Sequence, residues 1–203
     1  MTGRGGHAPL RACAGALALT AVLVAAGGSP AAAAAVRRET LAMGTRLVVE
    51  ADAVDRPTAL EATEAALRAV EAVEARLSTW REDSELARLN RSPAGTWFEL
   101  SPELERDLRE AEHWWRETGG SFDPGVAALV AVWDLRGAGR EPEATVLAAA
   151  RTSAGLGLLE LAGGRARRLA AGFGIEEGGF GKGVALREAA VAAVAAGARC
   201  VRL

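Results

Sequence analysis

The residues best suited to chemistry gather in one short stretch, residues 176–183 (EEGGFGKG), which holds the only lysine of the 203-residue chain. Its glycines have no Cβ atom, so the backbone there can approach a flat or charged ligand closely and adopt positive φ angles. Lys182 stands at the start of a predicted helix, and the N-terminus of a helix favours anions. The stretch is a candidate site for a phosphate or pyrophosphate group, and a glycine-rich turn with a solvated lysine is the alternative.

Two common phosphate-binding loops do not match this stretch. A P-loop reads G-x-x-x-x-G-K-[ST], but Glu176 stands where its first glycine would be and Gly183 where its hydroxyl would be. A dinucleotide fingerprint, G-x-G-x-x-G, that starts at Gly172 would place its third glycine at Glu177. The stretch therefore belongs to neither motif.

Asp123 and Trp80 are the other candidate binding residues. Asp123 follows a predicted helix end in the segment GGSFDP, residues 119–124. Its carboxylate could bond the free N–H groups that open the next helix, or bind the polar edge of a heterocycle. Trp80 ends a predicted helix, where its indole could stack on a planar ring or pack at the rim of the core. The residues alone leave both alternatives open for each side chain.

Four motifs follow one another along the chain: MGT at residues 43–45, RLSTW at 76–80 with SELARLN at 84–90, TGGSFDP at 118–124, and EEGGFGKG at 176–183. Their order and spacing resemble those of the ApbE-like family, the FAD:protein FMN transferases. The resemblance extends from about Thr40 to the last residue. It implies an exported enzyme that binds FAD and, with Mg²⁺, cleaves its pyrophosphate and transfers FMN to a threonine or serine hydroxyl of an acceptor protein.

The same resemblance assigns roles to individual residues. The implied contacts with the flavin nucleotide are Met43, Trp80, Ser121, Phe122, Asp123, Glu176 and Lys182. A backbone carbonyl in the glycine turn, that of Gly179 or Gly181, is the implied protein ligand of Mg²⁺. Such a site agrees with the preference of Mg²⁺ for oxygen ligands and with its use of substrate phosphates.

Some positions depart from the family pattern. Glu176 stands where the family has aspartate, Glu177 where it has an apolar residue, Val184 in place of an aromatic residue, and Arg187 in place of an aspartate. The family's later T-S-G segment, its histidine before D-P and its late metal-binding aspartate have no counterpart in this sequence. We therefore expect the N-terminal part of a flavin-transferase-like domain, truncated at its C-terminus. A non-catalytic exported FAD-binding protein, or an inactive fragment, is the alternative.

Residues 1–35 have the pattern of an export signal. Arg4 and Arg11 give a positive start, residues 14–26 form an apolar run, and residues 31–35 are small, as at a cleavage site. The expected mature domain is residues 36–203, in the periplasm or at the outer face of the cytoplasmic membrane. The apolar run is shorter than the roughly 20 residues of a membrane span. Membrane association is therefore expected only through an uncleaved signal or a membrane-bound acceptor.

The rest of the pattern favours an α+β fold, a mixed sheet with packed helices, because helix and strand signals are mixed without strict alternation. The formal charge of −2 is not that of a nucleic-acid binder, so no nucleic acid is expected as a partner. The expected strands are residues 40–51, interrupted at 43–45, a hairpin over 158–170, and 198–203. The expected helices are residues 57–77, a short helix within 81–90, 101–118, 124–133, 142–153 and 182–196.

Overall fold

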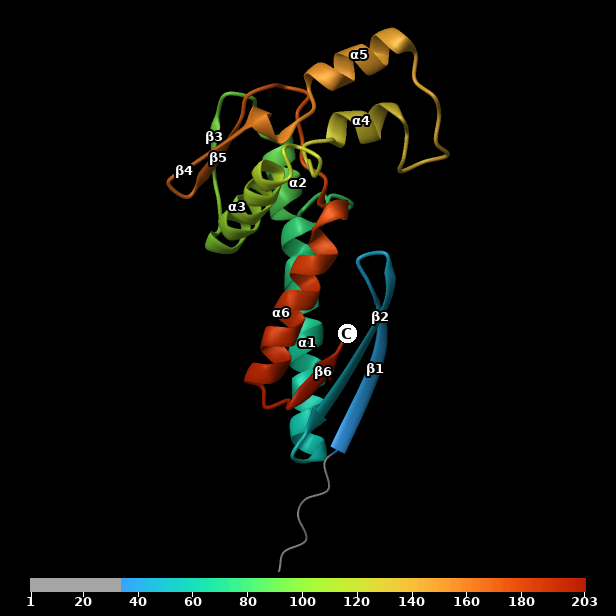
Figure 1. The fold of residues 1–203 in the computed structure, drawn as a ribbon, viewed down its shortest axis with the longest axis vertical. Helices are drawn as coiled ribbons and strands as arrows, with labels where there is room; N and C mark the ends of the chain where they lie inside the picture. Colours follow the sequence, from blue (N-terminus) through green and yellow to red (C-terminus); the bar gives the residue numbers. More distant parts are fainter. Residues whose placement is uncertain (1–33) are drawn as a thin grey trace, which may run out of the picture. The chain divides into compact units, whose positions relative to one another are not determined.

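The structure is a computed structural model that describes residues 34–203, so the predicted export signal lies outside it except for Ala34 and Ala35. Within the described residues the chain forms six α-helices and two three-stranded sheets (Figure 1). The predicted α+β class is confirmed. All strand pairs among these residues are antiparallel, so the strands are divided between two antiparallel sheets in place of one mixed sheet.

The first sheet is built on a long hairpin. β1 (Ala34–Ala42) pairs with β2 (Thr45–Ala53), and β6 (Cys200–Arg202) completes the sheet on the other side of β2. The turn between β1 and β2 consists of Met43 and Gly44, which both have positive φ angles, 49° and 70°. A type I′ turn requires this conformation at both central residues. The predicted interruption of the strand is this turn.

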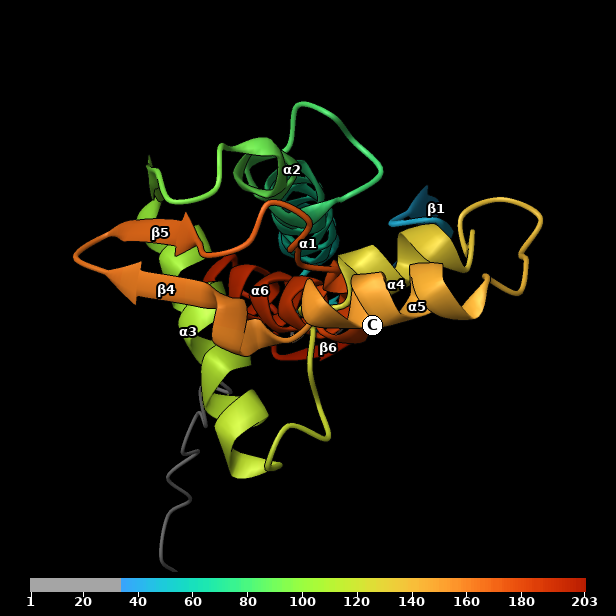
Figure 2. The same ribbon diagram turned by 90° about the horizontal axis from the view of Figure 1, so that it is seen from above.

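The helix α1 (Arg56–Leu77) packs against the first sheet and against α6 (Gly181–Ala195), and Figures 1 and 2 show the two helices side by side. Their buried faces are rich in alanine: Ala59, Ala62 and Ala66 on α1, and Ala185, Ala189 and Ala193 on α6. Such small side chains let the two backbones approach closely, while longer side chains on α1 extend the core. The helices predicted over residues 57–77 and 182–196 are confirmed.

Two serines fix the starts of the next helices. α2 (Glu85–Arg91) follows Ser84, whose Oγ accepts the N–H three residues later at 3.0 Å. α3 (Pro102–Glu117) follows Ser101, which does the same at 3.1 Å. Both serines are N-caps, because each side chain satisfies one of the free donors of the first turn of its helix.

The second sheet has the strand order β3-β5-β4. β4 (Leu159–Ala162) and β5 (Arg165–Arg168) form the predicted hairpin around Gly163 and Gly164. β3 (Trp97–Glu99) pairs with β5 and was not predicted. Three residues are too few to show an alternating pattern, so only the long-range pairing defines this strand.

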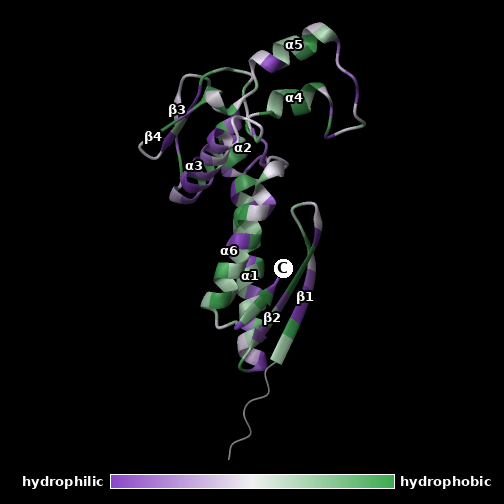
Figure 3. Cartoon of the chain, viewed as in Figure 1, coloured by the Kyte–Doolittle hydropathy of each residue, from purple (hydrophilic) through white to green (hydrophobic). Residues whose placement is uncertain are grey.

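The short helices α4 (Ala127–Val132) and α5 (Ala144–Thr152) lie within the segments predicted as helical but are shorter than predicted. In Figure 3 α4 is coloured mostly as hydrophobic, in contrast to α3, yet no residue of α4 is fully buried. Among residues 34–203 no helix combines the length and the apolar character needed to cross a bilayer.

Candidate functional site

Three segments that are distant in the sequence meet around a cavity of about 580 Å³, here called the Trp80 cavity. The β1–β2 turn, the C-terminal end of α1 and the segment that leads into α6 form its walls. Its lining residues are Met43, Gly44, Glu74, Ser78, Trp80, Glu177, Gly178 and Lys182. The cavity therefore brings together three of the predicted nucleotide contacts, Met43, Trp80 and Lys182.

Met43 has a backbone conformation that few residues other than glycine adopt, with φ at 49°. Its side chain reaches the first residue of α6, because a Cβ atom at Gly181 would lie 3.3 Å from Met43 Cε and 3.1 Å from Glu177 Cγ. The absence of a side chain at Gly181 thus allows the turn and the helix to pack closely. A strained residue beside a cavity supports a functional role for that cavity.

The start of α6 forms one side of the Trp80 cavity. No side chain caps this helix, so its first N–H groups lack the partner that a serine gives to α2 and α3. Lys182, the second residue of the helix, is exposed and lines the same cavity. Free N–H groups, the helix dipole and an ammonium group together favour an anionic group at this position.

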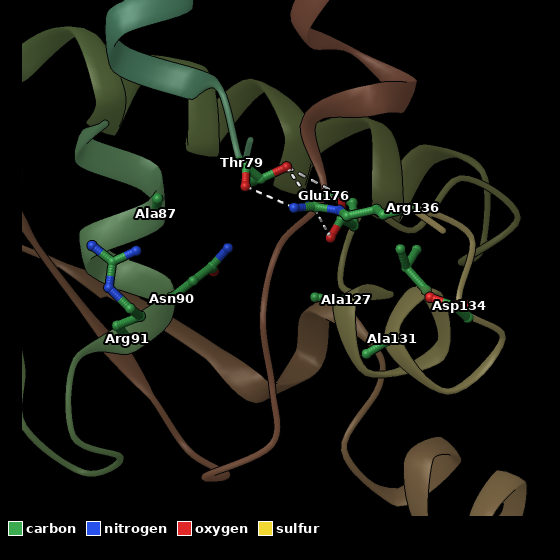
Figure 4. Close-up of a pocket in the computed structure, with 10 residues that line it drawn as sticks. Thr79, Ala87, Asn90, Arg91, Ala127, Ala131, Asp134, Arg136 and Glu176 are labelled. Carbon is green, nitrogen blue, oxygen red and sulfur yellow. Dashed lines mark hydrogen bonds and ion pairs between the residues drawn. The ribbon is translucent and has the colours of Figure 1, made fainter. Parts of the chain in front are cut away.

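The adjacent carboxylates of Glu176 and Glu177 have different partners. Glu177 is buried, lines the Trp80 cavity and accepts a hydrogen bond from the Thr79 hydroxyl. Glu176 lines a second cavity of about 430 Å³, here called the Arg136 cavity, and forms an ion pair with Arg136 at 2.8 Å (Figure 4). Of the two carboxylates, the one that faces the Trp80 cavity is therefore Glu177, which in the sequence is only a departure from the family pattern.

Arg136 is the main residue of the site that the sequence analysis missed. Its Nη1 donates to the Thr79 carbonyl at 2.7 Å, and its guanidinium carbon lies 4.9 Å from the centre of the Trp80 ring. Arg136 and Thr79 are 57 residues apart, so no local pattern connects them. Thr79 itself lies inside the RLSTW motif, which was the one available signal for it.

Ser121 and Phe122 follow the end of α3. Ser121 is exposed, whereas Phe122 lines a third cavity of about 490 Å³ that also includes Gly179. A Cβ atom at Gly179 would lie 3.4 Å from Phe122 Cε2, so the ring lies against the glycine turn. The Phe122 N–H donates to the Thr118 hydroxyl at 3.0 Å, which holds the segment in place. The structure brings Phe122 to the glycine turn and leaves Ser121 at the surface.

Asp123 uses its carboxylate within the turn. One oxygen accepts the N–H of Gly125 at 2.8 Å and that of Leu156 at 2.9 Å. The alternative that Asp123 caps the next helix is wrong, because α4 begins after Val126 and no side chain caps it. The carboxylate joins two loops beside Phe122, and its contact with a nucleotide stays a prediction.

The oxygen donors of the glycine turn fit Mg²⁺, which takes one or two carboxylates from a protein and completes its shell with water and phosphate oxygens. No group of three or more His, Cys, Asp or Glu residues that could hold a metal ion is found within residues 34–203. Gly181 is the first residue of α6, so its carbonyl accepts a helix hydrogen bond. Gly179 precedes the helix, so of the two predicted carbonyl ligands its carbonyl is the one outside the hydrogen bonds of α6.

Two departures from the family pattern have packing partners in the structure. Val184 is 5% exposed and belongs to the hydrophobic core. Arg187 forms an ion pair with Glu110 of α3, and its Nη2 lies 3.7 Å from Asp107 Oδ1. The apolar residue and the reversed charge therefore fit their surroundings.

Solved structures of flavin transferases have the same fold. The flavin transferase ApbE from Vibrio cholerae has a TM-score of 0.74 at 24% identity, over 83% of this chain and 56% of that one. The apo form of the flavinyl transferase ApbE from Pseudomonas stutzeri has a TM-score of 0.76 at 22% identity, with the same coverage. The ApbE protein from Thermotoga maritima has a TM-score of 0.71 at 24% identity, over 80% of this chain and 53% of that one. The chain thus spans little more than half the length of these structures, and at such identities the likeness shows the fold.

The sequence model of the ApbE family matches residues 43–201. Because this match covers most of the chain, the chain belongs to the ApbE family, and the resemblance drawn from its four motifs is confirmed. No curated protein sequence matches the chain.

Proposed function

We propose that this chain binds FAD in the Trp80 cavity and acts in FAD:protein FMN transfer to a threonine or serine hydroxyl of an exported acceptor protein. The observation that carries the proposal is the convergence of Met43, Trp80 and Lys182 on one cavity at the start of α6. Its volume lies within the range of small-molecule sites. Membership of the ApbE family and the fold shared with flavin transferases support it.

The side chains divide the work of binding. Trp80 offers a planar ring on which a heterocycle can stack. The start of α6 and Lys182 attract the pyrophosphate, and Glu177 with the Gly179 carbonyl would hold Mg²⁺. When bound, the ion supplies positive charge that neutralises the pyrophosphate. In the transfer the acceptor oxygen bonds to the phosphorus of FMN, the bridging P–O bond breaks, AMP leaves with the bridging oxygen, and the hydroxyl proton is released.

The proposal is tested in two stages with the full chain. FAD binding is measured by the change in flavin fluorescence with and without MgCl₂. FAD, Mg²⁺ and the exported protein fraction of the source organism are then incubated with the chain, and covalent flavin is detected by its fluorescence in a denaturing gel. Binding followed by Mg²⁺-dependent labelling supports the proposal. Binding without labelling favours the non-catalytic FAD-binding alternative, and the absence of binding contradicts both.

We also propose that the protein works outside the cytoplasm, in the periplasm or at the outer face of the cytoplasmic membrane. The support is the signal pattern of residues 1–35, which lies almost entirely outside the described residues. N-terminal sequencing of the protein from its source checks this. A new N-terminus near Val36 is expected, and an intact Met1 would leave the uncleaved anchor as the alternative.

Replacing Lys182 by alanine is expected to weaken FAD binding about tenfold or more, since a hydrogen bond to a charged group contributes about 1.5–3 kcal/mol. The ammonium group lies at the uncapped start of α6, where the pyrophosphate would bind. Titration calorimetry of FAD measures the change, and Lys182→Arg, which keeps the charge, serves as the matched control. Unchanged affinity in Lys182→Ala would support the alternative, in which Lys182 is a solvated lysine in a glycine-rich turn.

A further inference from the structure

Trp80 is an exposed side chain that needs help to hold one orientation. Its side chain is 69% exposed. The residue follows the end of α1, where its backbone N–H donates weakly to Ser78 Oγ at 3.3 Å. An indole with so little packing samples several rotamers. A ring used for stacking must instead be held in place before the ligand arrives, because ordering it on binding reduces affinity.

Arg136 supplies the missing contact. Its guanidinium carbon lies 4.9 Å from the centre of the Trp80 ring, a distance typical of a cation–π interaction. The same planar group donates to the Thr79 carbonyl at 2.7 Å and to both oxygens of Glu176 at 2.9 and 2.8 Å (Figure 4). These bonds fix the plane of the guanidinium, and the guanidinium in turn fixes the ring.

The two residues of this contact line different cavities. Of the two side chains, only Trp80 is a lining residue of the Trp80 cavity, and only Arg136 is a lining residue of the Arg136 cavity. The two cavities share no lining residue. The guanidinium therefore covers the indole from outside the Trp80 cavity, and the cavity that the ring lines is the one with Met43 and Lys182.

Arg136 also changes the charge next to the cavity. Glu176 and Glu177 are adjacent, and the Thr79 hydroxyl lies within hydrogen-bond distance of both carboxylates. The ion pair with Arg136 neutralises Glu176, so the carboxylates that remain to face an anionic ligand are those that line the cavity, Glu74 and Glu177. Without Arg136 the negative charge of Glu176 would add to theirs and oppose the pyrophosphate.

We propose that Arg136 is a positioning residue that fixes Trp80 as a one-sided stacking surface and neutralises Glu176, and thereby favours a ligand that joins a planar heterocycle to a phosphate. This proposal rests on the proposed binding of FAD in the Trp80 cavity. No local sequence pattern connects Arg136 with its partners, because 57 residues separate it from Thr79 and 40 from Glu176.

The first test concerns the ring and needs no ligand. The full chain is labelled with 5-fluorotryptophan, and the ¹⁹F resonance of Trp80 is assigned with Trp80→Phe. Arg136→Gln is expected to shift this resonance, while Arg140→Gln, in the same loop but bonded only to the Val132 carbonyl, is expected to leave it in place. A Trp80 resonance that is the same in Arg136→Gln and in the unaltered chain overturns the proposal.

The second test is a double-mutant cycle on FAD affinity. Trp80→Leu is expected to weaken binding about tenfold, as loss of a stacking ring does, and Arg136→Gln about fivefold. Because Arg136 acts partly through Trp80, the double variant is expected to bind more tightly than the product of the two effects predicts. Arg136→Lys keeps the charge without the planar group, and its affinity for FAD is expected to lie between those of Arg136→Gln and the unaltered chain.

Thermal unfolding of each variant separates positioning from a loss of fold. Strictly additive effects in the cycle, or a fall in affinity that only follows a fall in melting temperature, overturn the proposal. If the unaltered chain binds no FAD at all, the proposed function fails, and the ¹⁹F measurement still decides whether Arg136 holds Trp80.

Discussion

Replacing Arg76 by methionine is expected to lower the free energy of unfolding by about 3–5 kcal/mol, the usual result of removing one partner of a buried ion pair. Arg76 on α1 is 9% exposed, and its Nε donates to Asp107 Oδ2 on α3 at 2.8 Å. Asp107 is 1% exposed, so the substitution leaves a buried carboxylate without its hydrogen-bonded partner, and only the more distant Arg187 and Arg106, at 3.7 and 3.8 Å, still offset its charge. Arg76 also binds Glu188 of α6 at 2.8 Å, so the loss loosens the contact of three helices.

A double variant distinguishes the buried charge from general loss of packing. Arg76→Met combined with Asp107→Leu is expected to recover much of the lost stability, because two apolar side chains can replace a buried pair at little cost. Arg109→Met, which removes an exposed pair with Glu105 on α3, is the matched control and is expected to change stability by less than about 1 kcal/mol. Urea unfolding measures all three. A double variant as unstable as Arg76→Met alone would contradict the role of the buried carboxylate.

Asp107 also gives the fold a pH dependence. Burial raises the pKa of its carboxyl group above the ordinary value of 3.8, although Arg76 acts in the opposite direction. One oxygen, Oδ1, has no hydrogen-bond donor within the described residues, which agrees with this direction. The folded state holds the proton of Asp107 to higher pH than the unfolded chain does, so protonation of Asp107 contributes to the free energy of unfolding. This contribution is fully present at pH values below the ordinary pKa. It is lost as the pH rises through the raised pKa of the folded state.

Asp107→Asn should remove that dependence. The amide keeps a polar group opposite Arg76 but does not titrate. The free energy of unfolding of the variant, relative to that of the unaltered chain, should therefore increase as the pH rises above about 4. Unfolding free energies measured from pH 3 upward in steps check the sign. A difference between the two proteins that stays constant, or that moves in favour of the unaltered chain, would contradict it.

The parts of the fold that the sequence predicts are those specified by neighbouring residues. Ser84 and Ser101 mark the starts of α2 and α3 because a cap and its helix are local. Met43 and Gly44 were predicted to interrupt one strand, and the structure shows that they form the turn between two strands. β3 was missed because its three residues become a strand only through pairing with β5, which lies far along the chain.

The candidate site divides in the same way. Met43, Trp80 and Lys182 were predicted from motifs and meet at one cavity, while Arg136 enters the site only through tertiary contacts. The departures from the family pattern also find their explanation at a distance. Glu176 is paired with Arg136, 40 residues away, and Arg187 with Glu110, 77 residues away. A motif read by itself cannot show such compensation, because the two partners belong to different segments.

Arg168 is the second position where a large loss of stability is expected. This residue of β5 is 5% exposed, and its guanidinium donates to the carbonyls of Phe173, Ala171 and Ser92. Burial lowers the pKa of the group, but the bonded carbonyls take the place of water around it. Arg168→Met would leave the buried carbonyl of Phe173 and two part-buried carbonyls without this donor, and an unsatisfied buried group costs about 1–3 kcal/mol, so we expect a loss of about 3 kcal/mol.

The neighbouring arginine separates this effect from the loss of a positive charge. Arg167 points to the other face of the sheet, is about a third exposed, and pairs with Glu160, so Arg167→Met should cost less than about 1 kcal/mol. Arg168→Lys keeps the charge but cannot reach three carbonyls at once, and is expected to lose most of what Arg168→Met loses. Chemical unfolding of the three variants measures the order. If Arg168→Lys were as stable as the unaltered chain, the positive charge alone would explain the contribution of Arg168 to stability. The hydrogen bonds that join β5 to the loop before Glu176 would then not explain it.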